Sequence, residues 1–149
     1  MKKNHIRVVV LGVFLNQGKI LVFQGKDKVK DETFFRPLGG GVEFGETSEN
    51  ALIREIREEL GLEIKEPEYL GTLENIFIYQ GEPGHEVVLV YEARFVDPKV
   101  YSETNLHCVE SDGEDLCCQW LALENVERQH LRLYPHGLYT LLTKQINEI

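Results

Sequence analysis

The chain has 149 residues, of which 42% are hydrophobic and 28% charged, and this is enough for one globular domain with its own apolar core. Its formal net charge of −9 argues against a nucleic-acid backbone as the main partner, because such binding relies on clustered lysine and arginine. The three cysteines lack the two-residue spacing of a zinc knuckle, so we expect reduced thiols and a cytoplasmic location.

The chain opens with two apolar runs, residues 6–15 and 19–23, separated by the turn-forming residues 16–18. The first run is too short to span a membrane and no small-residue cleavage site follows it, so we predict a strand and neither an anchor nor an export signal. The glycine in the turn permits positive φ, and the pattern predicts a β-hairpin between the two runs. The charged residues 26–32 then predict a solvated loop.

A helix of about 13 residues is predicted between Thr47 and Gly61, because Thr47 suits an N-cap and Gly61 suits a C-terminal stop. One stripe of this helix is aliphatic and should face the core: Leu52, Ile53, Ile56 and Leu60. Three glutamates stand beside that stripe at positions i, i+3 and i+4: Glu55, Glu58 and Glu59.

This clustering of carboxylates destabilises a helix by roughly 0.2–0.5 kcal/mol per pair of like charges. A divalent cation would reverse the sign of the interaction, and Mg²⁺ commonly binds through one or two carboxylates together with substrate phosphates. The alternative is a solvated acidic face, which many surface helices carry. The helix alone favours that alternative, so the residues before the helix decide between a metal site and a solvated face.

Three consecutive glycines, Gly39 to Gly41, precede the helix. Glycine allows a close backbone approach to a ligand, and exposed carbonyl oxygens can bind a hard cation. Glu46 lies just before the helix, and we expect it to pair with Arg54 and so tie the loop to the helix. An ordinary glycine-rich turn is the alternative for this loop when it is considered alone.

The rest of the chain predicts strands at residues 69–79, 86–95 and 119–122 and a closing helix over residues 133–146. Strands dominate and two helices interrupt them. This order indicates an α+β protein in which helices pack on a mixed sheet. No repeat or linker interrupts it, so we expect residues 1–149 to form a single domain.

Loop and helix together resemble the motif of the Nudix hydrolase family. Gly40 is followed after five residues by Glu46, and seven residues later come Arg54 and Glu55, with the remaining fixed positions matched as far as residue 62. The residues before the motif run Pro-Leu-Gly-Gly, where many members have Leu-Pro-Gly-Gly. The resemblance implies an α/β/α sandwich with a mixed central sheet, the MutT-like fold.

The resemblance also implies a role for each motif residue. The metal would be held mainly by Glu58 and Glu59, with Glu55 as a ligand or base and the Gly39 carbonyl completing the sphere. Four residues would keep the motif in shape: Gly40, Glu46, Arg54 and Gly61. The cofactor would be Mg²⁺, with Mn²⁺ as the alternative, and it would activate water and neutralise phosphate charge.

The implied substrate is a small molecule in which a nucleoside diphosphate is linked to another group: a nucleoside triphosphate, dinucleoside polyphosphate, ADP-ribose or nucleotide sugar. Neither nucleic acid nor membrane is an expected partner, and a homodimer stays open. The general base of such enzymes is a glutamate in the motif or on a later loop, which leaves Glu86 and Glu74 as further candidates. We predict Glu86 as a candidate catalytic residue.

Substrate contacts are expected from Arg36, Gly40, Gly41 and Tyr79. Tyr79 lies where relatives acting on dinucleoside polyphosphates tend to carry a tyrosine. Five aromatic residues could stack a base, although aromatics on strands are more often core: Phe34, Phe35, Phe77, Tyr79 and Tyr134. Two other functions remain as alternatives, a catalytically silent nucleotide-binding Nudix-like module and an acidic calcium-binding protein.

Overall fold

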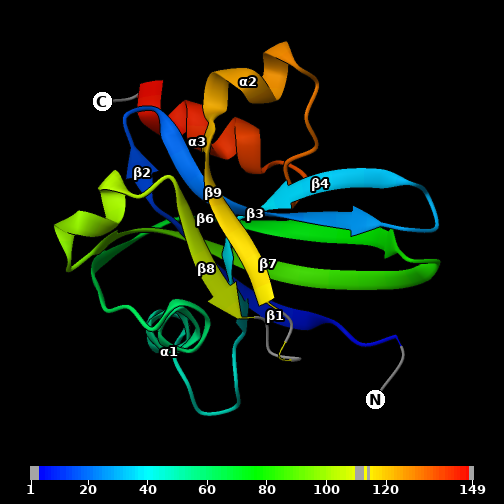
Figure 1. The fold of residues 1–149 in the computed structure, drawn as a ribbon. Coiled ribbons are helices and arrows are strands. Elements are labelled where there is room, and N and C mark those ends of the chain that lie inside the picture. The colour runs from blue at the N-terminus through cyan, green and yellow to red at the C-terminus, as the bar shows by residue number, and fades with distance from the viewer. Residues whose placement is uncertain (1–3, 110–112, 114, 148–149) are drawn as a thin grey trace.

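The computed structural model describes residues 4–109, 113 and 115–147. Helix α1 (Ser48–Leu60) lies on one side of the strands, and helices α2 (Leu123–Arg128) and α3 (Leu138–Asn147) lie on the other side (Figure 1). This arrangement confirms the expected α+β fold, a sandwich in which helices cover a mixed sheet. None of the described helices is long and apolar enough to span a membrane.

The first sheet has the strand order β5-β1-β7-β6. Its strands are β5 (Leu38–Gly41), β1 (Arg7–Val13), β7 (Glu82–Phe95) and β6 (Ile64–Tyr79). β1 pairs in parallel with β7 and antiparallel with β5, so the sheet is mixed. The apolar run in β1 is buried from Val9 to Val13, because helices and strands cover both faces of this central strand.

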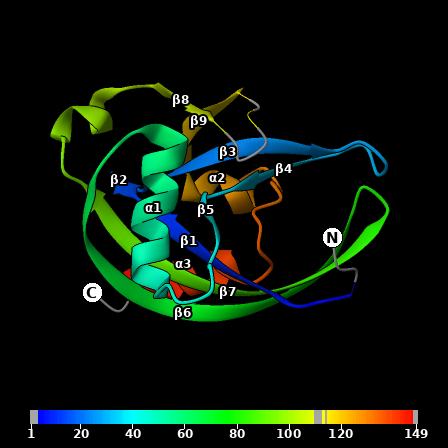
Figure 2. The same ribbon diagram turned by 90° about the horizontal axis from the view of Figure 1, so that it is seen from below.

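The second sheet is antiparallel and has the order β2-β3-β9-β8, with β4 paired to β3. Its strands are β2 (Leu15–Asn16), β3 (Lys19–Asp27), β9 (Asp115–Ala122), β8 (Asn105–Val109) and β4 (Glu32–Arg36). A short 3₁₀ helix, η1 (Pro98–Ser102), leads from the first sheet to the second. Figure 2 shows α1 lying between the two sheets, which diverge around it.

The predicted hairpin of residues 6–15 and 19–23 is wrong in its partners. The turn itself forms, with Gln17 and Gly18 at positive φ, but it joins only the two-residue β2 to β3. The longer run becomes β1 in the other sheet, and the chain changes sheet at Phe14. An apolar run that is buried on both faces gains more from two flanking strands than from one local partner.

The charged residues 26–32 are also not a simple solvated loop. β3 extends as far as Asp27 and β4 begins at Glu32, so the segment is the tip of a β-hairpin. Asp27 is only 3% exposed. Sequence composition marks such a segment as polar, and it cannot reveal that another hairpin packs on the tip.

Helix α1 forms as predicted. Thr47 accepts a hydrogen bond from the Asn50 amide at 3.2 Å, and Gly61 ends the helix with φ of +69°. The predicted aliphatic stripe faces the core, where Leu52 and Ile56 are fully buried. The core on this side of the sheets also contains Cys108 and Cys118, which form no disulfide and whose sulfur atoms are in hydrogen-bond contact at 2.7 Å.

The closing helix α3 begins five residues later than predicted, at Leu138. Pro135 lacks an amide donor, and Gly137 has φ of +92°, so the residues before Leu138 do not continue a helix. Leu138 and Leu142 are buried against the second core cluster, between the sheets and α2 and α3. The face of α3 that was expected to be apolar therefore makes the contact with the core.

Two long β-hairpins project from the same side of the molecule, β3–β4 and β6–β7, and they end near each other in both views (Figures 1 and 2). They belong to different sheets. The space between them, together with the glycine strand β5 and helix α1, is where the expected site residues lie.

Candidate active site

Arg54 on α1 is the centre of an ion-pair network that fastens the glycine strand to the helix. Its Nε and Nη2 donate to the two carboxylate oxygens of Glu46 at 2.8 and 2.9 Å, a bidentate arrangement. Nη2 also donates to the Gly41 carbonyl at 3.0 Å. The expected pairing of Glu46 with Arg54 is therefore confirmed, and β5 is held at a fixed distance from α1.

The third nitrogen of Arg54 contacts the acidic edge of the helix. Nη1 donates to Glu55 Oε1 at 3.0 Å and to Glu58 Oε2 at 3.4 Å. Hydrogen bonds from Arg54 lower the pKa of Glu46, and the bond to Glu46 raises the pKa of Arg54 further above its ordinary value. The guanidinium is thus a permanent positive charge among several carboxylates.

The three motif glutamates have different surroundings. The side chain of Glu55 is 13% exposed and that of Glu58 is 58% exposed, whereas the residue Glu59 is 7% exposed. Within the described part of the chain, no three His, Cys, Asp or Glu side chains lie together as a metal-binding group. The glutamates share the helix edge as expected, but they are not gathered as one set of ligands, because Arg54 takes two of them and Glu59 turns inward.

The glycine strand is shaped to receive a carboxylate. A side chain at Gly40 would overlap the carboxylate of Glu55, and one at Gly39, whose φ is +151°, would overlap the Val10 carbonyl. Only glycine therefore lets β5 pair with β1 on one side while Glu55 lies directly against its backbone.

The donor set fits a divalent cation of the Mg²⁺ type. Such ions require oxygen ligands, and the edge of α1 supplies carboxylates within one helical turn, with Glu55 directly against the backbone of the glycine strand. Glu58, which is mostly exposed, can change rotamer with little hindrance. The residues present are therefore compatible with the expected metal, although no ligand geometry follows from their positions here.

A cavity of about 590 Å³ lies between the two projecting hairpins. This volume is in the range of ligand-binding pockets. Arg36 and Tyr79, two of the expected substrate contacts, line it, as does Glu86. Gly41 does not line the cavity, but it lies beside Arg7, which does: a side chain added at Gly41 would meet Nη2 of Arg7 at 3.0 Å. Gly40 faces α1 on the opposite side of β5.

Glu86 lies near the start of β7, where it is buried, and it forms an ion pair with Arg7 Nη1 at 3.3 Å. Arg7 comes from β1 and lies directly opposite Glu86 in the parallel register. The other candidate base, Glu74, is exposed and lies on the opposite face of β6 from Asn75, which lines the cavity. The structure thus brings Glu86 to the cavity and leaves Glu74 outside it.

Sequence reasoning missed a group of basic residues in the cavity wall. Besides Arg36, the cavity is lined by Arg7 and by three lysines of the β3–β4 tip: Lys26, Lys28 and Lys30. The lysines recur at every second position, a regular spacing that could have drawn attention to them, although only Lys26 lies in β3 and Lys28 and Lys30 lie in the turn after it. Asp27, Glu32 and Glu86 also line the cavity, so its lining is basic only on balance, in a chain of net charge −9.

The aromatic residues divide between the cavity and the core. Phe34, Phe77, Tyr79 and Tyr134 line the cavity. Phe35 packs instead against the core cluster beneath α2 and α3, because neighbouring residues of a strand point to opposite faces. Four of the five aromatic residues considered for base stacking are thus available to a ligand.

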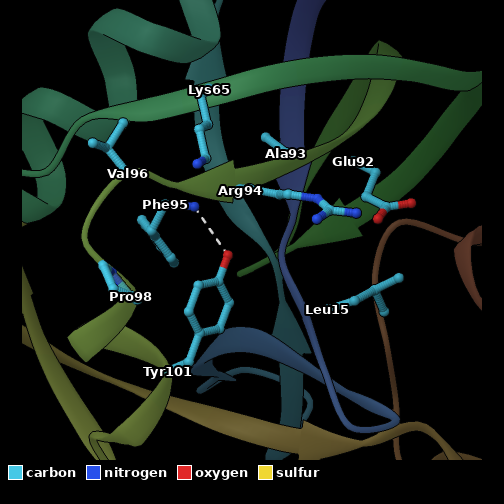
Figure 3. A pocket seen from close by; sticks show the side chains of 9 residues that line it. All are labelled: Leu15, Lys65, Glu92, Ala93, Arg94, Phe95, Val96, Pro98 and Tyr101. Atoms are coloured by element: carbon cyan, nitrogen blue, oxygen red, sulfur yellow. Dashed lines mark hydrogen bonds between the residues drawn. The ribbon is translucent and has the colours of Figure 1, made fainter.

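A second cavity, of about 430 Å³, lies at the other end of β7 (Figure 3). Lys65 and Arg94 border it above Tyr101, whose hydroxyl accepts a hydrogen bond from the Phe95 amide at 2.9 Å. Glu86 and Arg94 stand at opposite ends of one strand, roughly 26 Å apart at about 3.3 Å per residue. The second cavity therefore lies far from Glu86 and from the cavity between the hairpins.

A family model described as NUDIX domain matches residues 3–142 of the chain. Among solved structures, a MutT NUDIX hydrolase from Burkholderia pseudomallei superposes with a TM-score of 0.67 at 25% identity, covering 94% of this chain and 98% of that one. The MutT protein from Methanosarcina mazei Go1 superposes with a TM-score of 0.65 over 99% of this chain and 97% of that one, and at 17% identity it shows the fold alone.

Two curated proteins are similar over part of their length. An ADP-ribose pyrophosphatase from Methanocaldococcus jannaschii is 43% identical over 68 residues, which are 46% of this chain and 40% of that protein. An NAD-capped RNA hydrolase NudC from Pseudomonas aeruginosa is 31% identical over 90 residues, which are 60% of this chain and 27% of that protein. The matches therefore cover less than half of either curated relative.

Proposed function

The chain belongs to the NUDIX family, and we propose that it is a pyrophosphohydrolase that cleaves the diphosphate linkage of a nucleoside diphosphate joined to another group. The observation that carries the proposal is the Arg54 network, in which one guanidinium holds Glu46, the Gly41 carbonyl and Glu55 together. This network sets the acidic edge of α1 against the glycine strand. A solvated acidic face with no ligand would not require the helix to be held against the glycine strand.

The proposed cofactor is Mg²⁺, with Glu58 and Glu59 as the main ligands, Glu55 as a ligand or base, and the Gly39 carbonyl as a further ligand. The chemistry supplied by such a cation is neutralisation of charge on the diphosphate oxygens and activation of the attacking water. Arg54 and Glu46 contribute by holding the helix edge and the loop in place, because they are engaged with each other and are not free to contact substrate.

The basic lining of the cavity supports a diphosphate as the group that is bound. Arg36 lines the cavity and forms no ion pair with any described residue, so its guanidinium remains available to an anion. A planar guanidinium donates two parallel hydrogen bonds to phosphate oxygens, which fixes orientation as well as charge. We propose Arg36 as the residue that orients the diphosphate, with Tyr79 contacting the group attached to it.

Glu86 is the proposed proton acceptor outside the motif. It is buried, it lines the cavity, and the Arg7 guanidinium holds its carboxylate in one orientation. A general base must lie within hydrogen-bond reach of the water it deprotonates, and Glu86 meets the requirement of access to the cavity. Glu74, which is exposed on the other face of its strand, lacks that access.

The direct test is product release by the purified chain from a panel of nucleoside triphosphates, nucleotide sugars, ADP-ribose and dinucleoside polyphosphates. We expect turnover of at least one compound with Mg²⁺ and its loss in EDTA. Glu59→Gln is the matched variant, since it keeps the shape of the side chain and removes its charge. Tight nucleotide binding without turnover of any compound would instead favour the catalytically silent binding module.

The panel also addresses the substrate. The curated relatives are named for ADP-ribose and for NAD-capped RNA, so ADP-ribose and NAD are the first compounds to compare. Both contain an adenosine diphosphate joined to a second group, as the proposal requires. Two statements stay predictions: that residues 1–149 act as one domain and that the protein is cytoplasmic. The homodimer stays an open alternative.

A further inference from the structure

Asp27 is a buried carboxylate that the proposed chemistry does not use. It is the last residue of β3, at the tip of the β3–β4 hairpin, and it is 3% exposed. Its Oδ1 accepts hydrogen bonds from the backbone amides of Val29 at 3.0 Å and Lys30 at 3.1 Å. These two bonds stay within the hairpin tip and form a local turn.

The other oxygen of Asp27 reaches a different part of the chain. Oδ2 accepts a hydrogen bond from the backbone amide of Gln80 at 3.1 Å, and Gln80 lies in the tip of the β6–β7 hairpin. Burial opposes the charge, but the three amides from Lys30, Gln80 and Val29 outweigh it and hold the pKa of Asp27 below its ordinary value. The carboxylate is therefore charged and fully engaged.

Two more hydrogen bonds connect the same hairpin tips. The Gln80 side chain returns the contact by accepting the Lys28 amide at 2.9 Å. The Lys30 ammonium donates to the Ile78 carbonyl at 2.7 Å. Each tip thus donates to and accepts from the other, and the two hairpins, which belong to different sheets, are fastened at their free ends.

Directly inside these tips, each hairpin carries a phenylalanine that lies across a glycine of the paired strand. Phe34 is in register with Gly25, and a side chain at Gly25 would overlap its ring. Phe77 is in register with Gly84 in the same way. Both rings line the cavity, one from each wall. The glycines permit the rings to lie flat on the strands.

Tyr79 completes this lining. It immediately precedes Gln80, and its ring meets Phe34 edge-on with ring centroids 5.9 Å apart. The hydrogen bond from the Gln80 amide to Asp27 therefore fixes the backbone beside a ring of the β6–β7 hairpin that touches a ring of the β3–β4 hairpin. The position of the aromatic walls depends on the bonds at the tips.

We propose that Asp27 is a positioning residue which joins the two hairpin tips, so that Phe34, Phe77 and Tyr79 form a preformed slot for the planar base of the substrate. The proposal rests on the proposed function for the identity of the planar group. Any planar base can stack on an aromatic side chain, whichever polar groups the base carries, so the slot would select a flat ligand. The phosphates would then be bound by the basic residues.

The test separates the link between the hairpins from the turn within one of them. In Asp27→Asn the side chain keeps one oxygen for the Val29 and Lys30 amides, but an NH₂ group replaces the oxygen that accepts the Gln80 amide. Asp31→Asn is the matched control, because Asp31 belongs to the same tip and its side chain is 84% exposed, paired only with Lys26 at 3.0 Å.

The first readout is hydrogen exchange of the Gln80 amide, which needs no activity. We expect Asp27→Asn to accelerate it at least about tenfold, with the Asp31→Asn variant unchanged. The second readout is binding of AMP and of ribose 5-phosphate by calorimetry, since the two probes differ only in the base. We expect native protein to prefer AMP by about tenfold, and Asp27→Asn to lose that preference through weaker AMP binding alone.

The inference is overturned if native protein binds AMP no better than ribose 5-phosphate. It is equally overturned if Asp27→Asn keeps the preference while the Gln80 amide exchanges faster, or if that amide stays protected in the variant. If Asp27→Asn fails to fold, Gln80→Ala removes the bond from Lys28 and keeps the Gln80 amide that Asp27 accepts, and Phe77→Leu removes one aromatic wall. Both variants must reduce the preference. If native protein prefers AMP but turns over none of the panel compounds, the proposed function is refuted and the inference about the slot is not.

Discussion

Two networks of the molecule, one at Arg54 and one at Asp27, are built around a single charged side chain but differ in their reach along the chain. Arg54 binds carboxylates and a carbonyl that lie at most 13 residues away. Asp27 joins two hairpins whose contacting residues are 53 positions apart. The residues proposed to hold the cation are therefore assembled locally, whereas the cavity that would receive the substrate depends on long-range contacts.

The comparison has a functional consequence. Changes near Arg54 should act on turnover, because they alter the acidic edge where hydrolysis is proposed to occur. Changes around the hairpins should act on binding of the substrate, because they alter the cavity. The separation of kcat effects from KM effects is the measurable form of this difference.

The largest effect is expected at the acidic edge itself. Glu58→Gln and Glu59→Gln should each lower kcat at least about a hundredfold at saturating Mg²⁺, because an amide is a far weaker ligand for a hard cation. Circular dichroism and thermal unfolding establish that the variants are folded. Near-native kcat in both would remove the basis for the proposed metal ligands.

The second effect separates the two candidate bases outside the motif. Glu86→Gln should lower kcat by about a hundredfold, at the lower end of the range for a general base, whereas Glu74→Gln should leave kcat within about twofold. The measurement is kcat against pH for both variants and the native protein. Equal behaviour of the two variants would show that access to the cavity does not identify the base.

The third effect concerns the glycine strand. In Gly40→Ala the added methyl group displaces the Glu55 carboxylate, and a small misplacement of a reacting group should lower kcat on the order of tenfold or more. Gly41→Ala should cost less, because its methyl group meets only the flexible end of Arg7. Steady-state kinetics of the two variants decide this, and a larger loss in Gly41→Ala would contradict it.

The smallest effect is expected in the cavity. Arg36→Ala should raise KM about tenfold and change kcat little, since it removes a charged hydrogen bond made equally in the ground and transition states. Arg128→Ala is a suitable comparison, because Arg128 is paired with Glu124 at 3.8 Å and neither residue lines the cavity. A fall in kcat with unchanged KM in Arg36→Ala would move Arg36 from binding to the chemical step.

Most features of the helix and its loop were accessible from the sequence. The caps at Thr47 and Gly61 and the buried stripe with Leu52 and Ile56 follow from spacing along one helix, and the pairing of Glu46 with Arg54 joins that helix to the loop just before it. Helical geometry relates positions three and four apart in a fixed way, so local pattern is sufficient. What spacing could not give was the orientation of the side chains, since Arg54 takes Glu55 and Glu58 while Glu59 turns inward.

The strands show where local pattern fails. The turn at Gln17 and Gly18 was recognised, yet the partner of β1 was not, because a strand can pair with any other edge of suitable polarity and burial. The charged tip around Asp27 was read as a solvated loop for the same reason. Its burial depends on Gln80, and composition cannot indicate which distant amide will reach a carboxylate.

The sequence by itself determined the family resemblance, the helix with its acidic edge, and the glycine strand that faces it. These features depend on residues that lie close together along the chain. Only the tertiary structure decided that Glu86 lies at the cavity while Glu74 does not, that lysines of a charged tip line a binding space, and that two hairpins are fastened through Asp27. Such facts arise when separate sheets meet, and no fixed interval along the chain encodes that meeting.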